Sequence, residues 1–206
     1  MEKIIYNKVT PELVAEFKKI VPGKVHVNGD INDDYSHDEM PIYGKGMPDV
    51  VIEATTTEDI AAVVKLCYEN SIPVIPRGAG TGLTGAAVAV YGGVMIDMSK
   101  MNKILSYDKE NFVVHVQAGV LLNDLAEDAQ KQGLLYPPDP GEKFATLGGN
   151  VSTNAGGMRA VKYGCTRDYV RAMTVVLPTG EIVKLGATVS KTSTGYSLLN
   201  LMIGSE

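Results

Sequence analysis

A glycine-rich stretch is the part of this chain whose residue types point most directly to chemistry. The segment 76–85, with the sequence PRGAGTGLTG, follows the short apolar run 72–75 and contains four glycines. Where glycines remove the side chains from one face of a turn, consecutive backbone N–H groups can converge on an anion such as a pyrophosphate. The sequence therefore predicts a ligand that carries phosphate.

Two common phosphate-binding loops fit this stretch poorly. The loop of nucleoside triphosphatases ends in Gly-Lys-Ser/Thr, whereas two alanines follow Gly85. The dinucleotide fingerprint G-x-G-x-x-G matches residues 80–85, and Asp97 ends the next apolar run. Only eight residues, 86–93, precede that run, fewer than the roughly 10–12 that a crossover with a helix needs. We favour a loop that turns a strand onto the diphosphate of a flavin nucleotide.

Such a ligand needs a second binding segment, and the chain contains a candidate. Residues 137–141 (PPDPG) lead into 145–157 (ATLGGNVSTNAGG), a run without formal charge. Of the 22 glycines, six fall in residues 77–93 and six in 141–164. Uncharged amides and hydroxyls suit a ring that bears carbonyl and N–H groups, such as an isoalloxazine. The alternative interpretation is that these glycines only form turns between strands.

Six short motifs, in this order, resemble the FAD-binding domain of the vanillyl-alcohol oxidase / p-cresol methylhydroxylase (PCMH-type) superfamily. They are RGAGTGL at 77–83, QAG at 117–119, PDP at 138–140, the run 148–157, YG at 163–164 and GSE at 204–206. Within that superfamily the chain is most similar to FAD-linked glycolate oxidase subunits and D-lactate dehydrogenases, from about Tyr35 onward. The resemblance implies an α+β fold of two α/β lobes, a small parallel-sheet lobe and a larger, mainly antiparallel one.

The resemblance also implies which residues hold the FAD. Those expected around the diphosphate are Pro76, Arg77, Gly78, Ala79, Gly80, Thr81, Gly82 and Leu83, with Arg77 at its edge. Those expected along the isoalloxazine and ribityl parts are Pro138, Asp139, Thr146, Gly149, Asn150, Ser152, Thr153, Asn154, Ala155 and Gly157. Glu206 begins a segment that returns to the flavin in relatives. Some relatives tether the ring through a histidine where this chain has Thr81, so we expect non-covalent FAD.

The activity that the resemblance implies is oxidation of the CH–OH group of a small 2-hydroxy acid, with hydride transfer from the substrate α-carbon to FAD. In the family the catalytic and metal-binding histidines lie in a downstream substrate domain. We therefore expect this chain to be part of a longer protein, and we assign no catalytic or metal-binding residue in it. Electron-transferring flavoprotein or an iron–sulfur subunit is the expected redox partner. The alternative is a non-catalytic flavin-binding subunit that relays electrons.

Composition excludes several other classes. The net charge is −5 and no basic cluster occurs, which argues against nucleic acid as a partner. No apolar run has the length of a membrane span, and no charged-then-apolar leader opens the sequence. The two cysteines, Cys67 and Cys165, form no CxxC pair. We therefore expect a cytoplasmic protein without disulfides.

Local signals predict the elements that carry these motifs. Thr10 and Pro11 are typical of a helix start, and Thr56 with Asp59 three residues later forms a second start signal. Residues 50–54 and 72–76 read as strands of a parallel β-α-β unit that feeds the glycine loop. We expect the strands that follow, at 94–98, 104–107 and 112–117, to be antiparallel in character. We also expect a helix at 120–132 and a hairpin of 170–177 with 181–185. The expected domains are an N-terminal arm (1–43) and a FAD-binding domain (44–206) with lobes at about 44–100 and 101–206.

Overall fold

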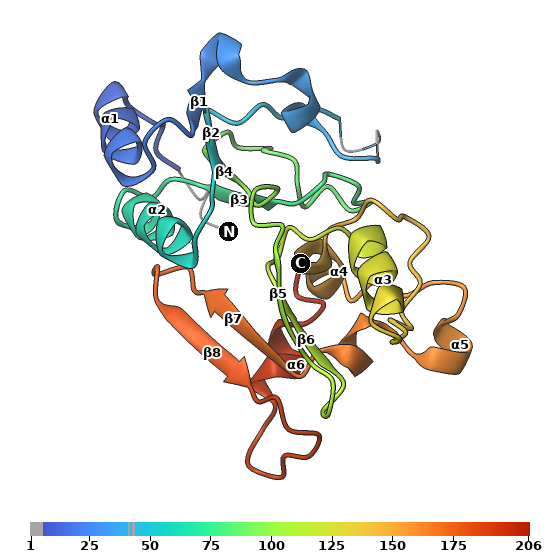
Figure 1. Cartoon of the computed structure of the whole chain (residues 1–206). Helices are drawn as coiled ribbons and strands as arrows, with labels where there is room; N and C mark the ends of the chain where they lie inside the picture. The colour runs from blue at the N-terminus through green and yellow to red at the C-terminus, as the bar shows by residue number, and fades with distance from the viewer. Residues whose placement is uncertain (1–5, 41, 43) are drawn as a thin grey trace. The chain divides into compact units, whose positions relative to one another are not determined.

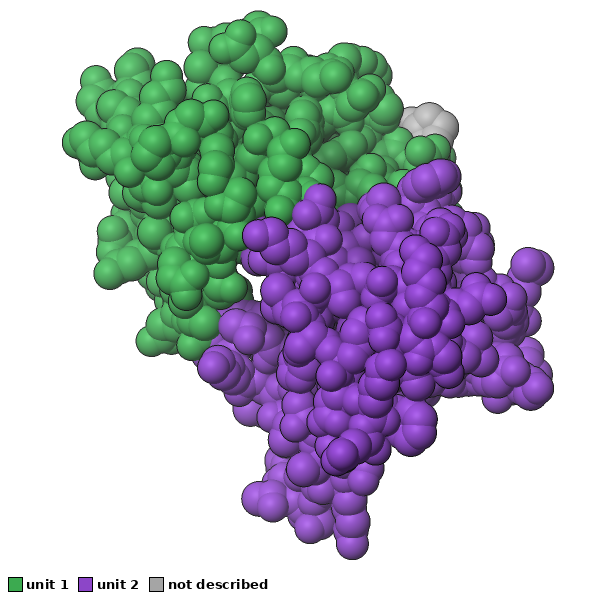
Figure 2. Space-filling model, in the orientation of Figure 1, with its two compact units in different colours: residues 1–100, 176–182 green, residues 101–175, 183–206 purple. Residues whose placement is uncertain are grey.

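The computed structural model describes residues 6–40, 42 and 44–206 (Figure 1). The chain forms two compact units, coloured separately in Figure 2. Unit 1 contains residues 1–100 and 176–182, and unit 2 contains residues 101–175 and 183–206. No helix among the described residues combines the length and apolar character that crossing a bilayer requires.

Unit 1 is built on a four-stranded sheet with two helices. Its elements are α1 (Pro11–Ile20), β1 (Val25–Val27), η1 (Asn28–Asp30), η2 (Asp33–Ser36), β2 (Val50–Glu53), α2 (Thr57–Glu69), β3 (Val74–Arg77) and β4 (Val94–Asp97). The strand order is β1-β2-β4-β3, in which β4 pairs in parallel with both β2 and β3. All four residues of β4 are buried, as expected for a central parallel strand.

The predicted helix starts are confirmed. The Thr10 side chain accepts a hydrogen bond from the backbone N–H of Leu13 at 3.4 Å, with Pro11 at the first helical position. At α2, the Asp59 amide donates to the Thr56 hydroxyl at 3.0 Å, and the Thr56 amide donates to the Asp59 carboxylate at 3.1 Å. This reciprocal pair satisfies two backbone donors that the first helical turn otherwise leaves unpaired.

The antiparallel character expected for residues 94–98 is wrong. Strand β4 lies between β2 and β3 and runs parallel to both. The crossover from β3 to β4 takes in all of residues 78–93 and contains no helix within them. Counting only residues 86–93 therefore understated its length. What separates this loop from the dinucleotide fingerprint is the missing helix after the glycines.

The N-terminal segment contributes a strand to the sheet of unit 1. Strand β1 pairs antiparallel with β2, with His26 opposite Val51, and so forms one edge of the sheet. The buried Phe17 of α1 joins the unit's apolar interior. Residues 1–5, 41 and 43 of the expected arm lie outside the described part of the chain, and the arm stays a prediction.

Unit 2 combines short strands and short helices. Its elements are β5 (Ile104–Asp108), β6 (Val113–Val116), α3 (Leu122–Lys131), α4 (Leu147–Ser152), α5 (Ala160–Tyr163), η4 (Thr166–Tyr169), β7 (Ala172–Val176), β8 (Ile182–Gly186) and α6 (Leu198–Met202). Strands β5 and β6 pair antiparallel, and β7 and β8 form the predicted hairpin. The tip of this hairpin belongs to unit 1, where Gly180 lies against Lys65 and the Ala61 carbonyl of α2. The core of unit 2 contains Val120, Leu122, Leu125 and Leu147.

Helix α4 was not predicted, because its sequence LGGNVS holds two glycines that weaken a helix. The Thr146 hydroxyl caps it by accepting the Gly149 amide at 3.3 Å. Gly148 lies so close to Ala118 that an added Cβ would come within 2.9 Å of the alanine Cβ. Close packing of the backbone therefore accounts for a glycine that helix propensity alone disfavours.

Candidate functional site

The glycine loop leaves β3 at Gly78 with an unusual set of unpaired backbone donors. The seven consecutive amides from Gly78 to Thr84 donate to no acceptor among the described residues. Each of these residues is at least partly exposed. Gly80 adopts a left-handed conformation with φ of 75°, which a glycine reaches without strain. The loop is therefore an accessible row of N–H groups suited to an anion.

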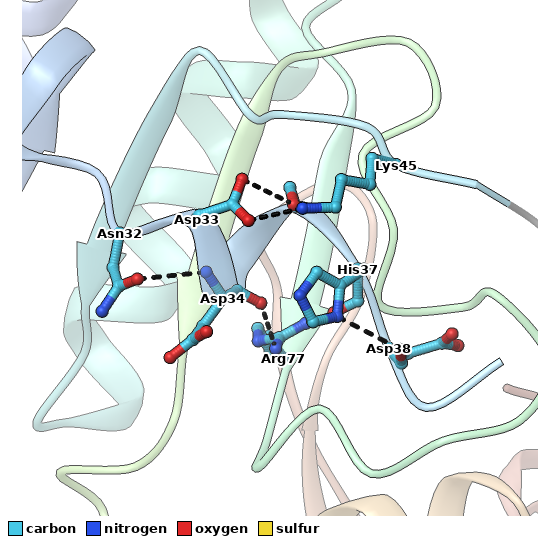
Figure 3. Close-up of polar contacts among 8 residues, drawn as sticks. Asn32, Asp33, Asp34, His37, Asp38, Lys45 and Arg77 are labelled. Carbon is cyan, nitrogen blue, oxygen red and sulfur yellow. Dashed lines mark hydrogen bonds and ion pairs between the residues drawn. The ribbon is translucent and has the colours of Figure 1, made fainter. Parts of the chain in front are cut away.

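The guanidinium of Arg77, a residue expected at the edge of a diphosphate, donates to backbone carbonyls of unit 1. Its Nη2 donates to the Asp34 carbonyl at 2.7 Å, and its Nη1 donates to the His37 carbonyl at 2.9 Å (Figure 3). Its Cζ lies 5.5 Å from the centre of the Tyr35 ring. Only 7% of the residue is exposed, and this burial lowers the pKa of the guanidinium. The side chain of Arg77 thus binds the protein's own backbone.

A polar cluster lies beside the start of the loop. The Tyr35 hydroxyl donates to the Asp97 carboxylate at 2.7 Å, and the amide and hydroxyl of Ser99 donate to the same carboxylate at 2.7 and 3.0 Å. Burial, reinforced by Asp97, raises the pKa of Tyr35 far above its usual range. A cavity of about 260 Å³ adjoins this cluster. It is lined by Asn32, Asp34, Tyr35, Arg77, Gly78, Ala79, Asp97 and Ser99.

In unit 2, the loop around Asp139 is clamped by two cations. The Asp139 carboxylate accepts from Lys143 through one oxygen and from the Arg159 Nε at 3.0 Å through the other. The hydrogen bond from Lys143, with the charges of both cations, lowers the pKa of this carboxyl. Gly157 lies directly against the Asp139 carbonyl, where no Cβ would fit. Both oxygens of the Asp139 carboxylate are thus paired within the protein.

Most predicted polar side chains after Gly149 are also engaged. The Ser152 and Thr153 hydroxyls donate to the Gly148 and Gly149 carbonyls at 2.9 and 3.1 Å. The side-chain oxygen of Asn154 accepts the Arg167 amide at 2.9 Å. Asn150 differs, because its buried Nδ2 has no hydrogen-bond partner among the described residues.

The C-terminal residues lie on the end of α4. The Glu206 amide donates to the Ser152 carbonyl at 3.0 Å, and the Gly204 amide donates to the Val151 carbonyl at 3.0 Å. Arg167 supports this segment, since its guanidinium donates to the Asn200 and Ile203 carbonyls at 2.9 and 2.7 Å. Within unit 2 the structure therefore brings Glu206 next to Ser152, one of the residues predicted with it.

Sequence reasoning missed several residues that shape these two loops. Lys143 stands four positions after Asp139, a spacing that could have suggested their ion pair. Asp38 accepts the Gly85 amide at 2.8 Å and lies 47 positions from it, so no local sequence pattern predicts this bond. No local sequence pattern indicates Arg159 or Arg167 either. Arg159 pairs with a carboxylate distant in sequence, and Arg167 donates to a backbone carbonyl distant in sequence.

Comparisons with known proteins agree with the geometry. Residues 48–186 match the family described as FAD binding domain. The D-lactate dehydrogenase of Anaerostipes hadrus is 76% identical over 206 residues, all of this chain and 43% of the relative. The glycolate oxidase subunit GlcD of Bacillus subtilis is 43% identical over 173 residues, 84% of this chain and 37% of the relative. This chain thus spans less than half the length of these relatives.

A solved structure shows the same fold. The p-cresol methylhydroxylase structure with bound substrate superposes with a TM-score of 0.82 at 25% identity, covering 98% of this chain and 42% of that one. The fold is therefore PCMH-type, as the motifs predicted. With the family match over residues 48–186 and relatives of this similarity, the chain belongs to the family of FAD binding domains found in D-lactate dehydrogenases and glycolate oxidase subunits.

Proposed function

We propose that this chain is the FAD-binding part of a flavin-dependent 2-hydroxy-acid dehydrogenase of the D-lactate or glycolate type. The family match supports the cofactor, and the names of the two relatives, a D-lactate dehydrogenase and a glycolate oxidase subunit, support the substrate class. The substrate itself and the redox partner concern the whole protein. For these we propose a small 2-hydroxy acid, and electron-transferring flavoprotein or an iron–sulfur subunit.

One observation carries the proposal, namely the seven unpaired amides of Gly78 to Thr84. A row of N–H groups on a glycine loop binds phosphate oxygens without needing a cationic side chain. The loop residues after Arg77 carry no formal charge, and the guanidinium of Arg77 is held by carbonyls. We infer that main-chain amides of this loop, and not the Arg77 side chain, bind the diphosphate oxygens.

In unit 2, one unpaired donor favours a bound ligand. Gly148 and Gly157 pack against Ala118 and the Asp139 carbonyl and so shape the surrounding backbone. The buried Nδ2 of Asn150 lacks an acceptor within the described residues, and an unpaired donor of this kind costs about 1–3 kcal/mol. We propose that Asn150 and the surrounding segments 138–146 and 152–157 form the ring-binding part. When bound, FAD supplies the acceptor for the substrate hydride, and this chain holds and orients it.

Two further features remain proposals. Thr81 occupies the position where some relatives carry a tethering histidine, which supports non-covalent FAD. Both cysteines are free and Cys67 is buried, which supports a reducing compartment such as the cytoplasm.

Titration with FAD tests the proposed function directly. At a free FAD concentration about 100 times the dissociation constant, the free energy of unfolding should rise by about 2.7 kcal/mol. The melting temperature should then rise by about 5–10 °C, whereas NAD should leave it unchanged. Acid precipitation should release all flavin into the supernatant. A stabilisation by NAD without one by FAD would contradict the proposal, and flavin left on the precipitate would contradict non-covalent binding.

A further inference from the structure

The glycine loop is held at both ends by one distant stretch of chain, residues 34–39. At its start, Arg77 donates to the Asp34 carbonyl at 2.7 Å and to the His37 carbonyl at 2.9 Å (Figure 3). At its far end, the Gly85 amide donates to the Asp38 carboxylate at 2.8 Å. Between these points the Glu39 amide donates to the Gly82 carbonyl at 3.1 Å. These four bonds join residues that are forty or more positions apart.

The Arg77 side chain also determines the shape of the loop's first turn. Gly80 takes its left-handed conformation directly beside the guanidinium, and a Cβ at that position would overlap it. The loop therefore turns around the arginine, with glycine required by both the conformation and the contact. Removing the guanidinium would leave that turn without its main support.

Asp38 has the charge opposite to that expected near a diphosphate. Only 6% of the residue is exposed, and its two carboxylate oxygens accept the Gly85 and Met40 amides at 2.8 and 2.9 Å. A carboxylate at this place repels an anionic ligand. Its contribution must therefore come from the hydrogen bonds that fix the loop and not from its charge.

We propose that Arg77 and Asp38 are positioning residues, which hold the glycine loop in the shape that leaves its seven amides free for a diphosphate. A glycine-rich loop has large conformational freedom, and its ordering would otherwise weaken ligand binding. Fixing the loop in advance removes that cost. The inference rests on the proposed function and adds to it the residues that prepare the binding loop.

The test compares two carboxylates that make the same type of bond. Asp38 accepts the Gly85 amide and Asp49 accepts the Gly93 amide, both at 2.8 Å, but only the first bond lies on the loop. We would measure the dissociation constants of FAD, and of ADP as a diphosphate without flavin, for Asp38→Ala, Asp38→Asn and Asp49→Ala. Urea unfolding of each variant gives its stability independently of the ligand.

Asp38→Ala should weaken both ligands by about tenfold or more, while Asp49→Ala should leave them within about twofold of the unsubstituted chain. Asp38→Asn keeps one acceptor oxygen, enough for the Gly85 amide but not for the Met40 amide as well, and loses the repulsive charge. Both affinities should therefore fall less than in Asp38→Ala. Unchanged affinity in Asp38→Ala, or equal weakening in Asp49→Ala, would overturn the inference.

Arg77→Lys provides a second, independent variant should Asp38→Ala fail to fold. Lysine keeps the charge but cannot span both carbonyls, so FAD and ADP should again bind about tenfold more weakly. Arg171→Lys is the matched control, because Arg171 also donates to two backbone carbonyls, at 3.2 and 3.3 Å, far from the loop in sequence. Equal affinities in the two lysine variants would overturn the inference. If the unsubstituted chain bound neither ligand, the proposed function itself would fail.

Discussion

Replacement of Gly157 by alanine probes how tightly the Asp139 loop is built. A Cβ at this position would overlap the Asp139 carbonyl group and come within 2.9 Å of the Pro140 nitrogen. These are backbone atoms, so no side-chain rotation can relieve the overlap. The φ of Gly157 is not in the left-handed region, and the cost of the substitution therefore comes from the contact alone.

The expected loss follows from the forced movement of the backbone. Overpacking of this kind costs about 1–3 kcal/mol, which lowers the melting temperature of a chain of this size by about 2–12 °C. The displaced Asp139 loop should also bind FAD more weakly, since the loop is part of the proposed ring-binding segments. Thermal unfolding followed by circular dichroism gives the first quantity, and FAD titration gives the second.

Gly141→Ala is the matched control within the same loop. No atom lies within 4 Å of a Cβ built on Gly141, and its φ is also outside the left-handed region. Alanine there should be neutral, or stabilising by about 0.4–1 kcal/mol through the unfolded chain. Equal melting temperatures for the two variants would refute the claim that the Gly157–Asp139 contact fixes the loop.

Three further outcomes are expected. Burial, with a smaller effect of Tyr169, raises the pKa of Tyr136 to about 12. The contribution of Tyr136 to the free energy of unfolding is therefore complete below about pH 10 and is lost as the pH rises toward 12. Urea unfolding from pH 8 to 11 should show this loss of stability, and Tyr136→Phe should lessen it. Thr56→Ala removes the cap of α2 and should lower the free energy of unfolding by about 0.5–2 kcal/mol, so an unchanged urea midpoint would contradict the assigned cap. Gly80→Val places a branched side chain at a φ of 75° against the Arg77 guanidinium and should abolish FAD retention on gel filtration; full flavin occupancy in that variant would remove the loop from the site.

Local signals predicted the parts of the fold that local forces determine. The caps at Thr10 and Thr56 are confirmed because a cap depends on residues three positions apart. The antiparallel expectation for 94–98 failed because strand direction depends on the path of a crossover, which periodicity does not encode. Helix α4 was not predicted because the glycine at 148 packs against Ala118, about thirty positions earlier in the chain.

In the candidate site, too, local sequence predicted some features and missed those that depend on contacts distant in sequence. Glycine spacing predicted a loop that offers its backbone amides, and the amides of residues 78–84 have no acceptor among the described residues. The sequence explained only part of the need for glycine at position 80. A glycine turn predicts its backbone conformation, but not its contact with the Arg77 side chain. The supporting bond of Asp38 spans 47 positions and has no sequence pattern. Whether the amides touch FAD stays a prediction.

The path of the chain through the hairpin has a consequence for synthesis. The polypeptide passes between the units at 100/101, 175/176 and 182/183, so unit 1 is built from two separate stretches. During translation the first stretch emerges well before the hairpin tip that rests on Ala61 and Lys65 through Gly180. A nascent chain that stops short of the tip leaves this face of α2 uncovered. A shortened protein that ends at residue 100 would carry the same bare face, so a cut at that apparent boundary would not isolate a finished domain.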